Sequence, residues 1–253
     1  MYQSVTLDVN GRLLRGIVRT PQGEGKFPTL IFMHGFTVDK VGPARLYEMF
    51  AQQCQAEGIA VIRFDFYGCG ESDGNFNEMT IGTEMTEMTA IYKWAETQSY
   101  VDQNKIFLGG HSMGGLLATL LAPTLKPCGV LAWSPALLMY YEASRRARTM
   151  MGETQIGYDI NGLELSKTYL KEASEMNFIE MARGYDGNVL IMHGEQDEEI
   201  AAACAYRYQQ LYKEKLNIHL VKGANHQFTS LPWRKELYDV SLDFLKKTSG
   251  LEA

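Results

Sequence analysis

A serine on a sharp turn between a strand and a helix constrains this chain more than any other feature. Residues 106–108 form an apolar run typical of a buried strand, and residues 116–122 are typical of a helix. Between them lies Ser112, at the centre of a Gly-x-Ser-x-Gly motif. A side chain at Gly110 or Gly114 would collide with the neighbouring strand or helix. The sequence therefore predicts a strained turn that presents a nucleophilic hydroxyl beside a helix N-terminus.

Most of the chain alternates short apolar strands with amphipathic helices. Two strands, at residues 4–9 and 12–19, are joined by Asn10 and Gly11, a strong hairpin signal. Further strands are predicted at residues 29–33, 60–65, 129–133, 188–193 and 217–221, and helices at residues 45–57, 81–97, 201–216 and 234–247. This alternation predicts an α/β fold whose central sheet is mostly parallel, with helices on both faces and the antiparallel hairpin at one edge.

The alternation breaks down between residues 136 and 187. This segment is rich in Tyr, Met, Arg and Glu, and it is too long for a connection inside a compact α/β domain. We interpret it as a cap inserted over the active site. The chain then divides into a first core part (residues 1–135), the cap (136–187) and a second core part (188–253). The alternative is a set of surface helices unrelated to catalysis.

Composition excludes several classes of function. The net charge of −6 does not suit nucleic acid or an anionic membrane as a partner. The chain begins without a basic and apolar leader and has no apolar run long enough to span a bilayer, so we expect a cytoplasmic protein. The four scattered cysteines have neither disulfide nor metal-ligand spacing. We therefore expect no metal and no cofactor. The glycine-rich turn at residues 67–74 lacks a phosphate-loop ending, which favours a structural loop.

Polar residues follow three of the predicted parallel strands, where functional groups of open α/β sheets collect. They are Ser112, an acidic turn after residues 188–193, and His226 after residues 217–221. In this arrangement Ser112 attacks a carbonyl carbon, and His226 takes its proton and later gives one to the leaving group. A carboxylate holds the imidazole in the required tautomer.

The base and the acid each have competitors. The other histidines are His34 in the loop after residues 29–33, His111 beside the serine and pointing away from it, His193 buried at a strand end, and His219 within the last strand. Only His226 occupies a loop just past a late strand. The candidate acids are Glu195, Asp197, Glu198 and Glu199. Asp197 fits best, because its short carboxylate lies a few residues beyond the strand.

The loop at residues 34–39 is expected to lie beside Ser112. Backbone N–H groups in such a loop can stabilise the oxyanion that forms during acyl transfer. We predict the N–H of Phe36 as one donor and the N–H of Met113 as the second. The side chain of His34 is expected to support this loop rather than to react.

Five motifs carry a resemblance to a known family. They are His34-Gly35-Phe36, residues 65–72, Gly110-His111-Ser112-Met113-Gly114-Gly115, His193-Gly194-Glu195-Gln196-Asp197, and Gly223-Ala224-Asn225-His226 with Phe228. The chain resembles the α/β-hydrolase superfamily over nearly its whole length. Within it, the chain is most similar to bacterial cinnamoyl (feruloyl) esterases and to related hydrolases of the serine-aminopeptidase and monoacylglycerol-lipase types.

This resemblance implies a serine carboxylic ester hydrolase that acts on hydroxycinnamate esters through an acyl-enzyme. In those esterases the insert recognises the phenolic end of the substrate. By local similarity, Gln155 and Tyr169 are the predicted hydroxyl-binding residues. The expected partner is a small-molecule ester, and a homodimer is left open.

Four other functions compete with this one. A lipase-like acylglycerol hydrolase would use apolar cap residues as an acyl channel, namely Leu137, Leu138, Met139, Met150 and Met151. A general short-chain carboxylesterase and a peptidase would use the same three catalytic residues. A non-catalytic binding module is disfavoured, because a pure binder has no need of a strained serine.

Overall fold

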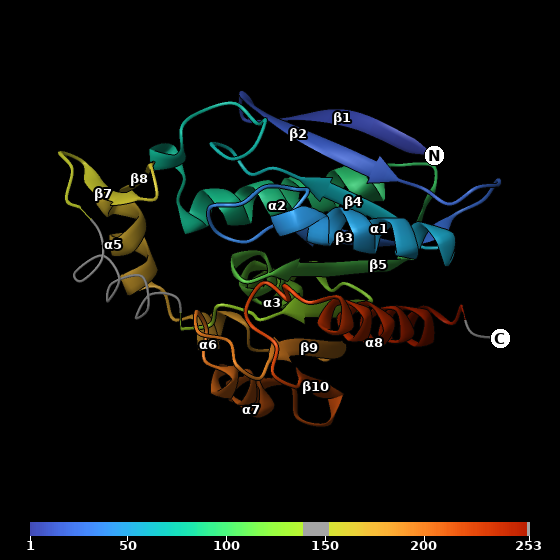
Figure 1. Cartoon of the computed structure of the whole chain (residues 1–253). Helices are drawn as coiled ribbons and strands as arrows, with labels where there is room; N and C mark the ends of the chain where they lie inside the picture. Colours follow the sequence, from blue (N-terminus) through green and yellow to red (C-terminus); the bar gives the residue numbers. More distant parts are fainter. Residues whose placement is uncertain (139–151, 252–253) are drawn as a thin grey trace.

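An eight-stranded, mostly parallel sheet organises the part of the chain that the computed structural model describes, residues 1–138 and 152–251. The strand order is β1-β2-β4-β3-β5-β6-β9-β10 (Figure 1). The strands are β1 (Tyr2–Val9), β2 (Arg12–Arg19), β3 (Phe27–Met33), β4 (Ala60–Phe64), β5 (Val101–His111), β6 (Gly129–Trp133), β9 (Asn188–Gly194) and β10 (Leu216–Val221). Within this eight-stranded sheet, the β1–β2 and β2–β4 pairs are antiparallel and the other pairs are parallel. Both antiparallel pairs involve the edge hairpin. The predicted fold class is confirmed.

Helices cover both faces of this sheet (Figure 1). The helices among the described residues are α1 (Leu46–Ala56), α2 (Ile81–Glu96), α3 (Met113–Leu125), α5 (Lys167–Glu175), α6 (Phe178–Met181), α7 (Gln209–Tyr212) and α8 (Leu231–Ser249), with 3₁₀ turns η1 (Pro43–Arg45), η2 (Phe76–Glu78), η3 (Ala202–Tyr208) and η4 (Lys213–Lys215). The predicted continuous helix at residues 201–216 is wrong, because η3, α7 and η4 replace it. Lys213 adopts a φ of 47°, which interrupts helical geometry. Among the described residues, no helix is both long and apolar enough to cross a membrane.

The central strands are buried on both faces, which explains their continuous apolar sequences. In β3, Leu30 and Phe32 pack into one core with residues of α1 and α8. The alternating residues Ile31 and Met33 pack into the other core, which includes residues of α2 and α3. The sheet is thus a rigid platform between two apolar layers.

The edge hairpin forms as its turn sequence predicts. Asn10 and Gly11 have φ values of 57° and 82°, the left-handed pair that a two-residue hairpin turn requires. The Gly11 N–H donates to Asp8 Oδ1 at 2.7 Å, and Val9 pairs with Arg12 across the turn. Local turn chemistry therefore sets the register of β1 against β2.

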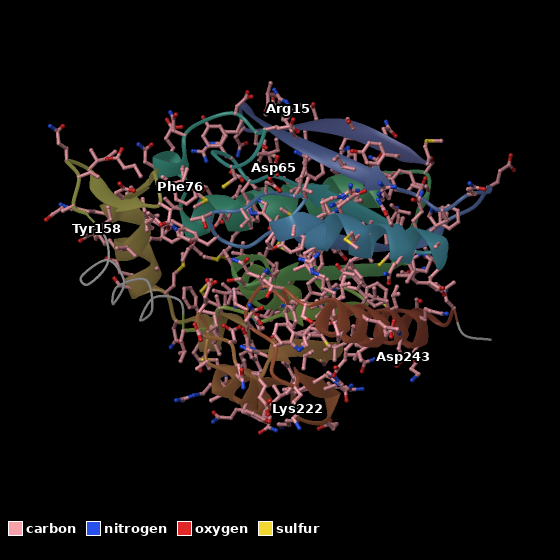
Figure 2. All side chains as sticks on the ribbon, viewed as in Figure 1. Arg15, Asp65, Phe76, Tyr158, Lys222 and Asp243 are labelled. Carbon is pink, nitrogen blue, oxygen red and sulfur yellow. The ribbon has the colours of Figure 1, made fainter. Side chains whose placement is uncertain are left out.

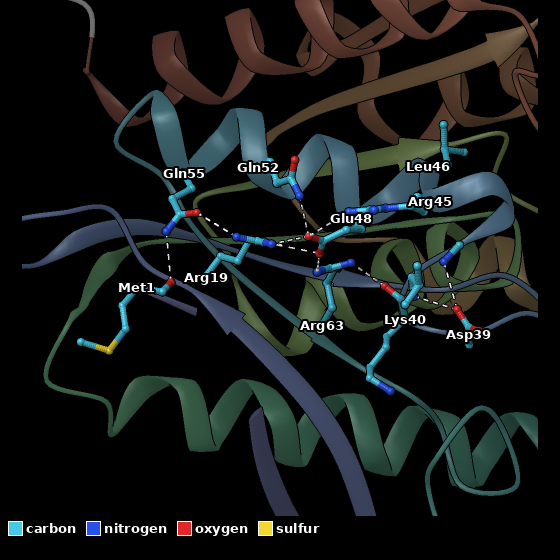
Figure 3. A network of polar contacts seen from close by, with 12 residues as sticks. Met1, Arg19, Asp39, Lys40, Arg45, Leu46, Glu48, Gln52, Gln55 and Arg63 are labelled. Atoms are coloured by element: carbon cyan, nitrogen blue, oxygen red, sulfur yellow. Dashed lines mark hydrogen bonds and ion pairs between the residues drawn. The ribbon is translucent and has the colours of Figure 1, made fainter. Parts of the chain in front are cut away.

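A buried network of charges fastens α1 and the loop after β3 to the sheet (Figure 3). Arg63 of β4 and Arg19 of β2 both pair with Glu48 of α1. Arg63 also donates from Nη1 to the Lys40 carbonyl at 2.7 Å. The Lys40 ammonium lies 2.6 Å from Asp65 Oδ2 at the end of β4. Charged side chains of β4 and of the residue that follows it therefore fasten the loop between β3 and α1.

The described part of the predicted cap consists of a hairpin and two short helices. The hairpin pairs β7 (Gly157–Ile160) with β8 (Leu163–Ser166) as a sheet of its own. It lies against η2, where Asn77 Nδ2 donates to Glu164 Oε2 at 3.0 Å. Figure 2 shows Tyr158 on this hairpin and Phe76 next to it. The division of the chain into core and cap stays a prediction.

Candidate active site

Ser112 lies on a sharp turn between β5 and α3. Its φ of 54° and ψ of −111° are strained for a residue with a side chain, and its N–H donates to the Trp133 carbonyl at 2.8 Å. A Cβ on Gly110 would lie 2.4 Å from the backbone of Gly114, and one on Gly114 would lie 2.3 Å from the Met33 carbonyl. Only glycine fits at both positions, as predicted, and the strain is held by close backbone packing on each side.

Asp197 and His226 meet in the loops after β9 and β10. His226 Nδ1 lies 2.7 Å from Asp197 Oδ2, and both residues are buried. Asp197 Oδ1 accepts the N–H groups of Glu199 and Ile200 at 2.9 and 2.8 Å. Burial acts to raise the pKa of Asp197, but hydrogen bonds with His193 and then with His226 outweigh it and lower the pKa. The carboxylate is therefore ionised and accepts the Nδ1 proton of His226.

His193 is a second imidazole beside the same carboxylate, and its sequence position predicts burial but no further role. Its Nε2 lies 2.9 Å from the Ile200 carbonyl and 3.3 Å from Asp197 Oδ2. A carbonyl oxygen only accepts, so this nitrogen carries a proton and donates. The signal that could have revealed it is its position four residues before Asp197 at the end of a buried strand.

His34 supports the loop after β3, as predicted. Its Nδ1 donates to the Gly35 carbonyl at 2.7 Å, and its Nε2 accepts the N–H of Phe66 at 3.0 Å. Burial lowers the pKa of His34, although the Gly35 contact opposes the shift. The neutral ring thus joins the loop to the chain after β4.

The two predicted oxyanion donors flank Ser112. Met113 begins α3, and Phe36 lies in the turn after β3. Among the described residues, neither of these two backbone N–H groups donates to a backbone carbonyl. The loop is close to Ser112, since a Cβ on Gly35 would lie 3.3 Å from Ser112 Cβ. The Gly114 N–H donates to the His34 carbonyl at 3.1 Å and ties this loop to α3.

The predicted substrate-binding residues occupy different places. Tyr169 of α5 is fully buried. Its hydroxyl donates to Glu84 Oε2 at 3.4 Å and lies 3.9 Å from the sulfur of Met113, and its ring packs on Phe36 with centroids 5.5 Å apart. Gln155 is exposed just before β7. The structure therefore brings Tyr169, and not Gln155, against the side chains of both predicted oxyanion residues.

Burial also perturbs the carboxylate beside Tyr169. Burial first, and then the charge of Glu87, raise the pKa of Glu84 well above its ordinary value. A protonated Glu84 carboxyl is compatible with a buried position against a tyrosine hydroxyl.

In residues 1–138 and 152–251, no group of three or more His, Cys, Asp or Glu side chains is placed to hold a metal ion. Of the apolar residues predicted for an acyl channel, Leu137 is buried and Leu138 is half-buried. The remaining three, Met139, Met150 and Met151, lie outside the described residues.

Comparison with known proteins agrees with this architecture. Residues 27–155, half of the chain, match the family described as serine aminopeptidase S33. The chain belongs to this family of α/β-hydrolases. The predicted resemblance to the α/β-hydrolase superfamily is confirmed.

Among curated relatives, an uncharacterised 31.7 kDa protein of Escherichia coli is 36% identical over 98 residues, 38% of this chain and 33% of the relative. The mitochondrial palmitoyl-protein thioesterase ABHD10 of Mus musculus is 28% identical over 188 residues, 69% of this chain and 60% of the relative. The chain thus spans between one third and three fifths of the length of these two relatives.

Solved structures extend the match over the whole fold. Est1E from Butyrivibrio proteoclasticus with bound ferulic acid has a TM-score of 0.84 and 23% identity, over 97% of this chain and 99% of that one. Mouse α/β hydrolase domain-containing protein 10 has a TM-score of 0.73 and 21% identity, over 97% and 99%. At these identities the likeness shows a shared fold.

Proposed function

We propose that this protein is a serine ester hydrolase that works through an acyl-enzyme, with Ser112, His226 and Asp197 as nucleophile, base and acid. One observation carries the proposal: a buried 2.7 Å bond joins His226 to Asp197, in a fold whose strained turn between β5 and α3 presents Ser112. Because Nδ1 of His226 donates to the carboxylate, Nε2 is left with a lone pair for a proton of the nucleophile.

The reaction follows from these groups. His226 Nε2 takes the Ser112 hydroxyl proton while Oγ attacks the ester carbonyl carbon, and the carbonyl oxygen becomes an oxyanion. The N–H groups of Phe36 and Met113 stabilise that charge. The intermediate collapses, the alcohol leaves with the proton from His226, and an acyl-serine remains. Water then repeats the cycle with His226 as base, which releases the acid and restores the serine.

For the substrate, we propose hydroxycinnamate esters such as ferulates. The sequence resemblance to cinnamoyl esterases supports this choice, as does Tyr169, an amphipathic aromatic side chain placed against both oxyanion residues. A hydroxycinnamoyl group attached to Ser112 would lie near this ring if it extended toward α5.

A specific observation favours a second candidate, an aliphatic acyl ester or thioester. The Tyr169 hydroxyl is already engaged with Glu84, and Gln155 is exposed whereas Tyr169 is fully buried. An aliphatic acyl group needs no hydroxyl-binding partner, so it does not compete with the hydrogen bond between Tyr169 and Glu84. The relative named a palmitoyl-protein thioesterase is consistent with an aliphatic acyl group.

A paired substrate panel tests both candidates. The purified protein is assayed on methyl ferulate and methyl caffeate, on short and long aliphatic nitrophenyl esters, and on a long-chain acyl thioester. A large advantage in kcat/KM for the hydroxycinnamates supports the first proposal, and an advantage for aliphatic substrates supports the second.

The variant Ser112→Ala tests the mechanism. It is expected to lose turnover on every substrate of the panel and to lose labelling by a fluorophosphonate probe, with an unchanged circular dichroism spectrum. Ser4→Ala, an exposed serine on the edge strand β1, serves as the control and should behave as wild type. Turnover retained by Ser112→Ala would refute the acyl-enzyme.

A further inference from the structure

Two buried residues that the reaction itself does not use, Tyr47 and His111, connect the parts of the candidate active site. Tyr47 lies in α1, and His111 is the last residue of β5, directly before Ser112. Their exposed fractions are 1% and 3%. A polar side chain buried this deeply must find partners, so the atoms that it contacts indicate its purpose.

Hydrogen bonds fix the protonation state of His111. Its Nε2 lies 2.9 Å from the backbone carbonyl of His226, and its Nδ1 lies 2.8 Å from the Tyr47 hydroxyl. Because a carbonyl only accepts, Nε2 carries the proton, and Nδ1 accepts from the tyrosine. Burial first, and then the charge of His226, lower the pKa of His111 to about 3. The ring is therefore neutral and held in one tautomer.

Ring contact adds to this hydrogen bond. The rings of His111 and His226 lie 4.6 Å apart between centroids, at 35° to each other. The backbone of this loop is itself under strain, since Phe228, two residues after His226, has a φ of 48°. His111 thus holds both the carbonyl and the ring face of the residue that Asp197 holds at Nδ1.

Tyr47 also lies close to the loop of residues 34–39, which carries Phe36 and is the predicted oxyanion loop. A Cβ on Gly35 would lie 3.7 Å from the Tyr47 hydroxyl. Burial raises the pKa of Tyr47, and a hydrogen bond with the Gly35 backbone opposes that shift. The ring of Tyr47 is fixed by the aromatic residues Phe32 and Trp133, at centroid distances of 5.4 and 6.5 Å. A single rigid side chain therefore contacts the oxyanion loop and His111 together.

We propose that Tyr47 and His111 are positioning residues that set the placement of His226 relative to Ser112 and to the oxyanion loop. This inference rests on the proposed function. Neither residue exchanges a proton with the substrate, and no bond at either of them changes during the cycle. Loss of the Tyr47 hydroxyl would leave the buried Nδ1 of His111 without its hydrogen-bond donor. It would also remove the contact that fixes the His111 ring relative to α1, so the ring and the His226 carbonyl that it binds could shift.

Three variants and one matched control test this proposal. Tyr47→Phe removes the hydroxyl and keeps the ring, and His111→Leu removes both hydrogen bonds. His111→Gln keeps one acceptor and one donor, which an amide can direct to Tyr47 and His226. The control is Tyr238→Phe, which removes a buried tyrosine hydroxyl that donates to the Leu46 carbonyl at 2.7 Å. Among the described residues, no hydrogen bond joins this hydroxyl to His111 or His226.

The readout is kcat per titrated active site, with KM determined separately. Tyr47→Phe and His111→Leu are expected to lower kcat about 10- to 100-fold, because misplacement by about 1 Å has effects of that size. KM should stay within about twofold. His111→Gln should recover most of kcat, and Tyr238→Phe should match wild type. A residue needed only for folding would change the number of active sites and leave kcat per site unaltered.

Two results would overturn the proposal. One is wild-type kcat per active site in both Tyr47→Phe and His111→Leu. The other is failure of His111→Gln to exceed His111→Leu. If His111→Leu does not fold, Tyr47→Phe carries the test, because its aromatic contacts are retained.

A wild-type protein without turnover on any ester would instead refute the proposed function. The low-field proton resonance of the His226–Asp197 bond then decides the positioning role. Its loss in Tyr47→Phe with retention in Tyr238→Phe supports the role, and an unchanged resonance in Tyr47→Phe refutes it.

Discussion

Replacing Asp197 by asparagine tests the catalytic role of the carboxylate at nearly constant shape. Oδ1 of Asp197 accepts two backbone N–H groups, from Glu199 and Ile200. An amide nitrogen cannot accept them, so the asparagine oxygen is expected to stay there and its NH₂ group to face His226. His226 Nδ1 would then have to accept a proton instead of donating one. Its Nε2 would carry the proton and could not serve as the base for Ser112.

The size of the effect follows from the 2.7 Å separation of His226 Nδ1 and Asp197 Oδ2. At an effective dielectric constant of about 20, opposite unit charges at this distance attract by about 6 kcal/mol. The imidazolium forms only as the reaction proceeds, so this attraction stabilises the transition state. At about 1.4 kcal/mol per tenfold change, it corresponds to roughly 10⁴-fold in rate. The same substitution in a Ser-His-Asp protease lowers kcat about 10⁴-fold.

The assay is kcat/KM on the best ester of the panel, with active sites counted by fluorophosphonate titration of the wild type and folding followed by circular dichroism. The matched control is Glu236→Gln. Glu236 also pairs with a histidine at 2.7 Å, His219, but this pair is partly exposed on β10 and α8. An exposed pair contributes about 0–1 kcal/mol, so the control should keep wild-type activity.

Retention of more than one tenth of the wild-type kcat/KM by a folded Asp197→Asn variant would contradict the proposed role of Asp197. The base would then not depend on this carboxylate, and Glu195, Glu198 or Glu199 would have to be considered again. A loss of about 10⁴-fold with an intact circular dichroism spectrum is the expected result.

Two further predictions concern stability. Glu48→Ala leaves the Arg63 guanidinium, only 1% exposed, without its carboxylate. The free energy of unfolding should fall by about 3–5 kcal/mol. The control in thermal melts is Glu96→Ala, which removes an exposed ion pair with Lys93 and should change the melting temperature little. Equal melting temperatures for the two variants would contradict a stabilising role of the buried network. Burial raises the pKa of Glu87 from 4.5 to about 7. Between pH 4.5 and about 7, the Glu87 carboxyl is ionised in the unfolded chain but keeps its proton in the folded one. The free energy of unfolding therefore falls as pH rises through this range. Glu87→Gln should reduce that fall in urea titrations at pH 4.5 and 7, and an identical pH dependence would show that Glu87 does not titrate in this window.

Local patterns were sufficient to predict the fold class, and they also selected the three proposed catalytic residues. The apolar runs of β3, β5 and β6 predict strands buried on both faces, and such strands in alternation with helices favour a parallel sheet. Ser112 and His226 could be chosen because each follows a strand end. The choice of Asp197 among four acids was an inference from side-chain length, and the structure places it 2.7 Å from His226.

The predicted helix at residues 201–216 was wrong, because the local signals there are weak. The segment at residues 201–216 has helical composition, yet it forms two 3₁₀ turns around a single turn of α-helix. Its first part, η3, packs against β9 and β10, and tertiary context routinely overrides helix propensity. Gln155 and Tyr169 were chosen together by similarity of short motifs; in the structure one is exposed and the other buried, and their role as hydroxyl-binding residues stays a prediction.

Local sequence accounts for the elements that depend on neighbours along the chain. The Asn10–Gly11 turn, the glycines around Ser112 and the apolar strands all follow from steric and periodic rules that act over a few residues. Which distant polar groups meet depends instead on how the whole chain folds. Tyr47 is 64 residues from His111, and His111 is 115 residues from His226. No periodicity encodes such a connection, because it arises when the sheet brings separate strand ends and the first residues of α1 to one place.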